Sequence, residues 1–461
     1  MSRVLRSLPL VLALSVGCDP ASPLVREFRG AYPEHVRPTG KVHEVTLTAA
    51  PTDVSFPDGR TLAVWAYNGQ VPGPTLRIRR GDTLRATLVN QLPQATTIHW
   101  HGVRVPNAMD GVPNVTQPPV EPGGRFVYEF TAKDAGTFWF HPHLRSPEQI
   151  ERGLAGVLIV EDESPPPFTR EVVWVLDDWL LDASGSIHPE FVTRRDLAHD
   201  GRWGNVPTVN GSSDTVLALR PGERIRLRLI NVANGRVFAP RWTGLDASVI
   251  AVDGLYTPGP LDPAGFTLAP GNRLDLDISV PANATARRIV IEDSFTRRPF
   301  PLATIVIDGA PVTTPTFPSP ARAHVPAWTD TLHVPPRISF RLEARAGGPY
   351  GLSWLINGEA MHPDHHHDGV PYSLPRGEWS KLRFENVSAR LHPMHMHGLF
   401  FKVIARNGVA VDEPYFRDTV LVRPRETVDV GTVPLDEGRW MAHCHILEHA
   451  ESGMMTLVEV R

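Results

Sequence analysis

The sequence predicts an all-β protein built from several sandwich domains. Helical periodicity is nearly absent from its 461 residues, whereas strand-like runs such as Thr83–Val89 (TLRATLV) and Arg224–Ile230 (RIRLRLI) recur along the chain. The 37 glycines and 46 prolines are typical of many short strands joined by turns. A chain of this length is too long to fold around one hydrophobic core, so we expect about three domains.

An internal repeat indicates where these domains lie. A Gly turn, a strand and a closing Asn recur at Gly81–Asn90, Gly222–Asn231 and Gly377–Asn386, and an Asn-Gly pair precedes each copy. The copies are about 145 residues apart, which predicts three sandwiches in series. Proline-rich stretches mark the linkers. The predicted bounds are 41–163 for the first domain, 164–310 for the second, 311–331 for a linker and 332–461 for the third.

The first 18 residues have the features of an export signal. Arg3 and Arg6 precede the apolar run Leu8–Val16, which is far shorter than the roughly 20 residues that a membrane-spanning helix needs. Cys18 ends the segment and resembles the lipidated cysteine of a bacterial lipoprotein; the alternative is an ordinary signal peptide with an incidental cysteine. We expect an exported protein of the periplasm or cell envelope, anchored through Cys18, with residues 19–40 as a flexible linker.

The charge of the chain argues against nucleic-acid binding, and its cysteine content argues against an internal disulfide. The formal net charge of −4 gives no broadly basic surface, so we expect no nucleic-acid partner. If Cys18 is lipidated or removed, Cys444 is the one remaining thiol, and no internal disulfide can form. Cys444 stands between two histidines in the stretch HCHILEHAESGMM, so a role other than cross-linking is expected for it.

Four His-x-His pairs predict a metal cluster. Residues i and i+2 of a strand point to one face, so each pair can offer two imidazoles to a common centre. Imidazole suits copper, zinc or iron, and eight neutral rings gathered without a metal would be a costly polar cluster, although one pair alone is more often a solvated strand face. Two pairs belong to the first domain and two to the third, so the cluster should lie between them, with the second domain as a spacer. The pairs are His99/His101, His141/His143, His395/His397 and His443/His445.

A second metal site is predicted on the opposite face of the same strands. Successive side chains of a strand point to opposite faces, so Cys444 points away from the histidines on either side of it. By the same alternation, His392 points away from His395 and His397. With His449 and Met454 these residues offer two imidazoles, one thiolate and one thioether, the set of a blue-copper electron-transfer site; zinc would not require the methionine. One stretch of backbone would then join the two centres.

These motifs, in this order, resemble the multicopper oxidases, specifically three-domain bacterial laccase-like enzymes, over roughly residues 41–461. The resemblance implies three consecutive cupredoxin-like Greek-key β-sandwich domains and four copper ions. It assigns the type 1 copper to the four residues just described, and the type 2 copper to His99 and His395. The two type 3 coppers would take His101, His141 and His445 on one side, and His143, His397 and His443 on the other.

The resemblance also implies the reaction. Four one-electron oxidations of a reductant would be coupled to the reduction of O2 to two waters. Asp110, in MDGVP, matches the family's acid near the type 2 copper and could assist proton delivery; its alternative role is to form a turn before Gly111. Ala450 stands where many bacterial relatives carry a glutamate, and Glu451 follows instead, so Glu451 is the second candidate acid.

Two classes of reductant remain open. The chain has no Met-rich run, and Ser388–Leu391 stands where cuprous oxidases carry acidic or Met residues, so phenolic or other aromatic donors are favoured. The alternative is a metallo-oxidase acting on Cu⁺, Fe²⁺ or Mn²⁺ in envelope metal homeostasis. The insertion His362–Asp368 (HPDHHHD) is either a solvated loop or an accessory metal site. We expect a monomer.

Three further hypotheses fit the pattern less well. A non-catalytic copper-binding envelope protein would not need the electron entry port that Cys444 and Met454 would form. A degenerate member of the fold would have lost ligands, and none of the twelve is missing. A copper nitrite reductase has no paired type 3 coppers, whereas this chain has eight cluster histidines.

Overall fold

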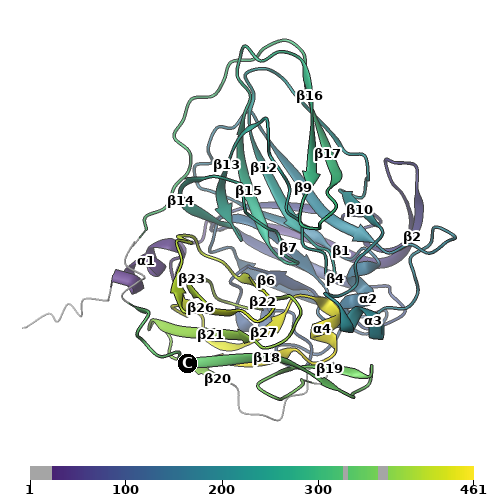
Figure 1. Ribbon diagram of the computed structural model, residues 1–461, viewed down its shortest axis with the longest axis vertical. Helices are drawn as coiled ribbons and strands as arrows, with labels where there is room; N and C mark the ends of the chain where they lie inside the picture. Colours follow the sequence, from purple (N-terminus) through teal and green to yellow (C-terminus); the bar gives the residue numbers. More distant parts are fainter. Residues whose placement is uncertain (1–22, 325–330, 362–371) are drawn as a thin grey trace, which may run out of the picture.

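The computed structural model describes residues 23–324, 331–361 and 372–461 (Figure 1). The described elements are almost all strands, arranged in six sheets that pair into three sandwiches, so the predicted fold class is confirmed. The signal segment, Cys18 and the insertion His362–Asp368 lie outside the described residues. Within those described ranges, no helix is long and apolar enough to cross a membrane.

The first sandwich pairs two four-stranded sheets, β2-β1-β4-β6 and β3-β8-β7-β5. It also carries the 3-10 helix η1 (Asn107–Met109) and helix α2 (Ser146–Glu151). Its strands are β1 (Val42–Ser55), β2 (Thr61–Tyr67), β3 (Thr75–Arg79), β4 (Thr83–Asn90), β5 (His99–His101), β6 (Arg125–Thr131), β7 (Gly136–His141) and β8 (Gly156–Glu161).

The second sandwich pairs the six-stranded sheet β10-β9-β12-β15-β13-β14 with the three-stranded sheet β11-β17-β16. Helix α3 (Arg194–Ala198) lies in the loop after β9. The strands are β9 (Arg170–Trp179), β10 (Val206–Val209), β11 (Val216–Leu219), β12 (Arg224–Asn231), β13 (Asp246–Val252), β14 (Leu255–Leu261), β15 (Arg273–Ser279), β16 (Arg287–Asp293) and β17 (Phe300–Ile307).

The third sandwich pairs the sheets β19-β18-β21-β26-β23-β24 and β20-β28-β27-β22-β25. Helix α4 (Leu447–Glu451) follows β27. The strands are β18 (Ile338–Ala346), β19 (Leu352–Ile356), β20 (Tyr372–Leu374), β21 (Ser380–Asn386), β22 (His392–Met396), β23 (Phe401–Arg406), β24 (Val409–Ala410), β25 (Thr419–Val422), β26 (Thr427–Thr432), β27 (Gly438–Cys444) and β28 (Met455–Val460).

The repeated asparagines have the same structural role in each sandwich. The closing Asn ends β4, β12 and β21, each of which pairs in parallel with the first strand of its domain. In the second domain, Asn231 donates to the carbonyls of Arg236 and Leu268 and accepts from the amide of Ala233, so one side chain ties down a loop; Asn90 and Asn386 make the equivalent bonds. The repeat therefore encodes buried hydrogen bonds as well as turns.

The segment before β1 differs from the predicted flexible linker. Residues Pro23–Ala31 form helix α1, whose Phe28 is fully buried, as is Tyr32 just beyond it. The Tyr32 hydroxyl donates to two main-chain carbonyls of the third domain, and the guanidinium of Arg104 in the first domain lies 4.9 Å from its ring centre. The linker prediction was wrong here because these two aromatic side chains bury enough apolar surface to hold the segment. Figure 1 shows α1 at the edge of the third domain, near β23.

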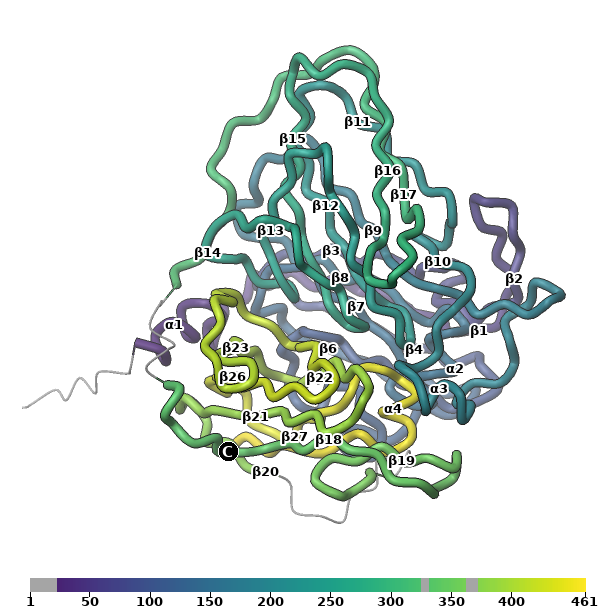
Figure 2. The backbone as a smooth tube through the Cα atoms, in the orientation of Figure 1, coloured from purple at the N-terminus to yellow at the C-terminus, as the bar shows by residue number. Residues whose placement is uncertain are grey.

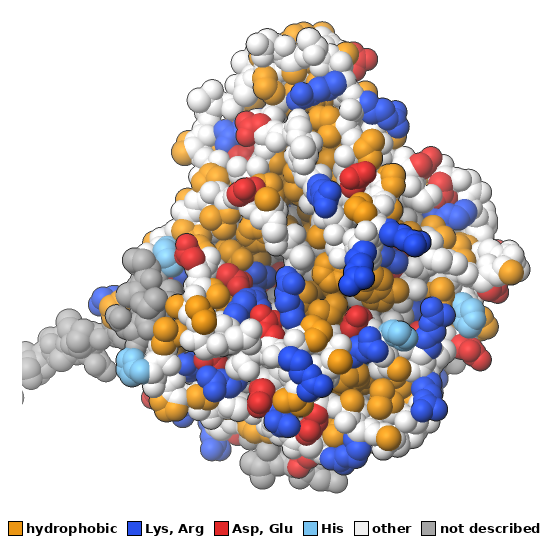
Figure 3. Space-filling model, viewed as in Figure 1, with side chains coloured by type: hydrophobic (Ala, Val, Ile, Leu, Met, Phe, Trp, Pro, Cys, Tyr) orange, Lys and Arg blue, Asp and Glu red, His pale blue; other side chains and the backbone are white. Residues whose placement is uncertain are grey.

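The three sandwiches meet where the short helices gather. Figure 1 shows α2, α3 and α4, one from each sandwich, close together, and α2 and α3 each contact α4. After β17 the chain runs along the outside of the second sandwich towards α1, as the tube in Figure 2 shows. On the face seen in Figure 3, basic and acidic side chains are interspersed with apolar ones rather than gathered into one patch.

Candidate metal centres

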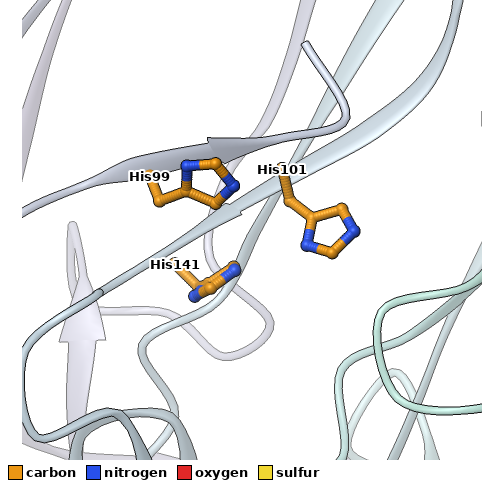
Figure 4. A group of neighbouring side chains, drawn as sticks. All are labelled: His99, His101 and His141. Carbon is orange, nitrogen blue, oxygen red and sulfur yellow. The ribbon is translucent and has the colours of Figure 1, made fainter. Parts of the chain in front are cut away.

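Two antiparallel strand pairs bring the predicted cluster ligands together. In the first domain, β5 pairs with β7 so that His99 lies opposite His141. In the third domain, β22 pairs with β27 so that His395 lies opposite His443. Figure 4 shows His99, His101 and His141 with their rings around a common space. Cross-strand neighbours lie about 4.5–5.5 Å apart at Cβ, so this register brings imidazoles of both strands into contact range.

All eight predicted cluster histidines lie in one buried group. Rings from the two domains stack on each other: His99 on His397 and His101 on His395, both with 3.8 Å between ring centres. His445 joins the group at 4.9 Å from His101 and 5.5 Å from His141, ring centre to ring centre. The sets of three whose ligand atoms lie within 4.8 Å of one another are His99/His101/His141, His99/His395/His397 and His143/His397/His443.

Hydrogen bonds fix the tautomers of several of these rings. Nδ1 of His99 and of His395 each donates to a main-chain carbonyl, at 2.8 and 2.9 Å, and Nδ1 of His141 does the same at 2.8 Å. Each neutral ring then keeps a lone pair at Nε2, and none of these Nε2 atoms has a hydrogen-bond partner among the described residues. Burial also lowers the pKa of His141 well below its usual value, so the ring stays neutral. Buried lone pairs of this kind fit a metal.

One contact within the cluster is unfavourable without a cation. His397 donates from Nδ1 to the Asp110 carboxylate, and His443 donates from Nδ1 to the carbonyl of Cys444. Their Nε2 atoms therefore both carry lone pairs, yet these atoms face each other at 3.1 Å. A positive ion coordinated by both nitrogens, together with His143, accounts for this arrangement.

The predicted mononuclear site forms a second buried group. Sγ of Cys444 lies 3.6 Å from Nδ1 of His392 and 3.9 Å from Nδ1 of His449, and these two nitrogens are 3.3 Å apart. Met454 is fully buried in the same core, and its carbonyl accepts from the amide of Cys444. Burial raises the pKa of the thiol, so binding a metal there must displace its proton.

Asp110 connects ligands from two domains. Its carboxylate accepts from Nδ1 of His397 at 2.8 Å, and its main-chain carbonyl accepts from Nδ1 of His99 at 2.8 Å. It is almost fully buried at the end of η1, and the following Gly111 has a φ of +83°, so the turn that the sequence suggested also exists. The turn places the carboxylate against the cluster, and both roles of Asp110 are therefore compatible.

The second domain is more than the predicted spacer. Its Arg273 forms a buried pair with Asp418, with Nη2 2.7 Å from Oδ2, and Asp418 lies 3.3 Å from Nε2 of His101. Burial alone would raise the pKa of Asp418, but the charge of Arg273 and the hydrogen bonds with His395 hold it well below its usual range. A charged carboxylate thus orients cluster rings from outside the ligand shell. Sequence reasoning missed both residues.

Close approach of the second domain depends on one glycine. Gly271 has a φ of +89°, and a Cβ at this position would lie 2.9 Å from Cε1 of His101 and 3.0 Å from Cδ2 of His445. Any side chain would displace a cluster ring, and glycine alone adopts this backbone without strain. The turn before β15 therefore packs directly against the cluster.

The two glutamates of α4 lie in different surroundings. Glu451, the predicted acid, is half-buried and lines a surface cavity with Leu144 and Arg145; its role stays a prediction. Glu448, one turn earlier, is fully buried, and burial raises its pKa to about 7 despite hydrogen bonds from Arg202 and Asn234 of the second domain. The sequence LEHAE offers no signal that separates the two, because only the docking of the second domain buries Glu448.

Comparison with known proteins gives matches along most of the chain. Family models described as multicopper oxidase match residues 48–165, 170–293 and 353–461. A crystal structure of a multi-copper oxidase from Pseudomonas thermotolerans is 36% identical, with a TM-score of 0.80 over 91% of this chain and 99% of that one. Multicopper oxidase MmcO of Mycobacterium tuberculosis is 27% identical over 92% of this chain and 89% of its own length. A laccase of Pycnoporus cinnabarinus is 27% identical over 91% and 89%, respectively.

Proposed function

The chain belongs to the multicopper oxidase family and is a copper-dependent oxidoreductase that uses O2, and on this premise we propose that it is a laccase-like enzyme. It would oxidise phenolic or other aromatic donors in four one-electron steps and reduce O2 to two waters. One observation carries the proposal: the end of β27 gives Cys444 to one buried donor group and His443 to the other. A copper-storage protein would have no use for this link.

The proposal gives every predicted ligand a place. Bound copper would accept single electrons at the Cys444 site and pass four of them to O2 at the histidine cluster. We assign the type 1 copper to His392, Cys444, His449 and Met454, and the type 2 copper to His99 and His395. The two type 3 coppers would be held by His101, His141 and His445, and by His143, His397 and His443. The close approach of Nε2 of His397 to Nε2 of His443, in a group with His143, supports the last of these sets.

The link between the two centres has two parallel parts. Cys444 is joined covalently to His443 and His445 through the backbone. In addition, its carbonyl accepts from Nδ1 of His443 at 2.9 Å, so a hydrogen bond shortens the route between the thiolate and a cluster ring. Both parts lie within β27 and the residue after it, where every side chain concerned is buried. Water is excluded from the whole route.

The described residues favour an organic donor over a metal ion. Within the described ranges, each set of three closely spaced His, Cys, Asp or Glu ligand atoms belongs to the two copper centres and the Asp418 contact. A cavity of about 630 Å³ lies beside the mononuclear site and is large enough for a substituted aromatic ring. The relative from Pycnoporus cinnabarinus is itself named a laccase. The metallo-oxidase remains the alternative, and the insertion His362–Asp368, which could be an accessory metal site, lies outside the described residues.

Absorption spectroscopy combined with oxygen uptake tests the function. Copper-loaded protein should show a blue thiolate-to-copper band and consume O2 with 2,6-dimethoxyphenol as the only donor, faster than with Cu⁺. Faster uptake with Cu⁺ would establish the metallo-oxidase instead. A colourless protein that binds copper without consuming O2 would leave only a storage role.

Replacing the cysteine separates the two centres. Cys444→Ser should abolish the blue band and phenol oxidation while the histidine cluster keeps its copper, because the cluster rings do not use the sulfur. Metal analysis should give one copper per chain less than the unmodified protein. Met394→Leu, opposite Cys444 on β22, is the matched control and should keep the band. An unchanged blue band in Cys444→Ser would refute the assignment.

We also propose that the protein is exported and held at the membrane by a lipid on Cys18. The support is the signal-like segment that ends at this residue. Cell fractionation should find the unmodified protein in the membrane fraction, and Cys18→Ala should release it into the soluble envelope fraction. If both proteins fractionate alike as soluble species, an ordinary signal peptide is the better account.

A further inference from the structure

Two loops of the second domain, residues 199–202 and 234–235, form a socket around the start of α4. The amide of Leu447, the first residue of this helix, donates to the main-chain carbonyl of Asn234 at 3.1 Å. Two residues later, Nε2–H of His449 donates to the main-chain carbonyl of His199 at 2.9 Å. Glu448, which lies between them, also accepts hydrogen bonds from both loops. Three consecutive residues of α4 are therefore held by another domain.

Two glycines allow the socket to close on the helix. Gly201 has a φ of +81°, and a Cβ there would lie 2.5 Å from Cγ2 of Ile446 and 2.8 Å from Oε2 of Glu448. Gly235 packs against Gly201, and a Cβ on Gly235 would lie 2.5 Å from the carbonyl oxygen of Asp200. A side chain at either position would push the loops or the helix apart, and glycine adopts the backbone of Gly201 without strain. Shape as well as hydrogen bonding therefore fixes α4 in the socket.

Asn234 joins all three domains through one buried side chain. Its Nδ2 donates to Oε1 of Glu448 in the third domain at 2.8 Å, and to the carbonyl of Pro147 in α2 of the first domain at 2.9 Å. Both N–H groups of the amide are thus used, and a rotated amide would set its oxygen against both acceptors. Pro147 lies four residues after the cluster ligand His143, and Glu448 directly precedes His449. The amide of Asn234 therefore connects segments that carry ligands of the two centres.

We propose that Asn234 is a positioning residue for the mononuclear site, holding α4 so that the ring of His449 keeps its place beside Cys444. The proposal rests on the proposed function, because the place of this ring matters for electron transfer only in the copper-loaded enzyme. Two imidazoles, a thiolate and a distant thioether form a trigonal set, whereas Cu²⁺ otherwise favours a tetragonal one. A ring that is free to move would let the site relax towards the geometry of the oxidised ion. Asn234 should therefore make reduction of the site more favourable.

Anaerobic titration of the blue band with a redox mediator tests this role. It gives the equilibrium constant for reduction of the mononuclear copper, which a loss of folding stability alone does not change. Asn234→Ala removes both bonds of the amide and should lower this constant about tenfold, with a changed copper hyperfine splitting in the EPR spectrum. Gly201→Ala displaces α4 by direct contact instead and should lower the constant as well. The second variant keeps the test open if the first one does not fold.

Each variant has a matched control. Asn90→Ala also loses two side-chain bonds to carbonyls, but within the first domain, and Gly185→Ala places a Cβ at a φ of +83° in open space. Both controls should leave the constant and the EPR spectrum unchanged, even where they lower the thermal midpoint. An unchanged constant in Asn234→Ala and Gly201→Ala, or an equal change in the controls, would overturn the positioning role. If the unmodified protein shows no blue band or no O2 uptake, the proposed function fails instead.

Discussion

Asp110 and Asp418 occupy equivalent positions on opposite sides of the histidine cluster. Each accepts ring N–H groups through a main-chain carbonyl, and each places a carboxylate within about 3.3 Å of a further cluster ring. Their surroundings differ, because Arg273 compensates the charge of Asp418, whereas one carboxylate oxygen of Asp110 has no hydrogen-bond partner among the described residues. Asp110 is therefore the better placed of the two to exchange a proton, and Asp418 the better placed to hold rings still.

Asp110→Asn tests the proton role. The substitution keeps the size of the side chain and the carbonyl bond to His99, but removes the charge beside His397. Turnover should fall about 10- to 100-fold, as expected for loss of a positioned proton donor or ligand-orienting group. Oxygen uptake per bound copper is the measurement, with the exposed Asp53→Asn as control. Normal turnover at full copper content would contradict the role.

The pair of Arg273 and Asp418 should matter for stability. Arg273→Met leaves the carboxylate buried without its charged partner, which costs about 3–5 kcal/mol in comparable buried pairs. Unfolding of the copper-free protein by urea should therefore occur at a lower concentration. In the double variant Arg273→Met/Asp418→Asn much of this loss should be recovered, because the side chain at position 418 is then uncharged and Asp253 is the one acidic partner of Arg273 left buried there. An equal loss in the double variant would show that Arg273 acts through packing alone.

Among the elements, α1 has an influence beyond its nine residues. It packs Phe28 into a core that contains residues of both the first and the third domain, and its Glu27 forms a buried ion pair of 2.5 Å with Lys402 of the third domain. The cluster histidines come from these same two domains. A helix at the start of the described chain therefore helps to hold the two halves of the cluster together.

Phe28→Ala should show this coupling. Loss of a fully buried phenylalanine costs about 3–5 kcal/mol, so the thermal midpoint should fall, and the copper content of the cluster should fall with it. Differential scanning calorimetry and metal analysis measure the two effects. Arg26→Ala, on the exposed face of α1, should change neither. A lower midpoint with normal copper content would limit α1 to a structural role outside the cluster.

For the molecule as a whole, the buried imidazoles predict how the copper-free protein responds to acid. Burial lowers the pKa of His101, His141, His392, His397 and His445 well below the usual value. Above a pH of about 6.5 these rings are neutral in both folded and unfolded chains, and stability does not depend on them. Below it the unfolded chain binds protons that the folded chain cannot, so stability falls as pH falls.

Each such ring contributes a slope of at most about 1.4 kcal/mol per pH unit, so the group should make the copper-free protein markedly acid-sensitive. Urea unfolding measured from about pH 7.5 down to about pH 5 should show this slope. His445→Gln should reduce it, because glutamine does not titrate. Bound copper should flatten the curve, since the metal competes with protons for the same lone pairs. Equal slopes with and without copper would contradict the explanation.

The sequence was sufficient for features that repeat and insufficient for features that arise on docking. The Asn-Gly pairs and the strands that follow them predicted three sandwiches, because each copy folds by contacts within its own domain. The parity of Cys444 against its neighbours was readable because a strand has a period of two. Arg273 and Asp418 are 145 positions apart and meet only across a domain interface, so no local pattern connects them. Sequence reasoning also could not find that the main-chain carbonyl of His199 accepts a hydrogen bond from His449, because every residue has such a carbonyl.

The division of ligands between domains sets the order in which the centres should fail under stress. His392, Cys444, His449 and Met454 all belong to the third domain, whereas the cluster takes half of its rings from the first. Separation of these domains would split the cluster and leave the mononuclear site whole. A partly opened molecule would still turn blue and accept one electron, but it would have no outlet to oxygen. Such damage would stop electron transfer before it reaches O2, so the damaged enzyme would not release partly reduced oxygen.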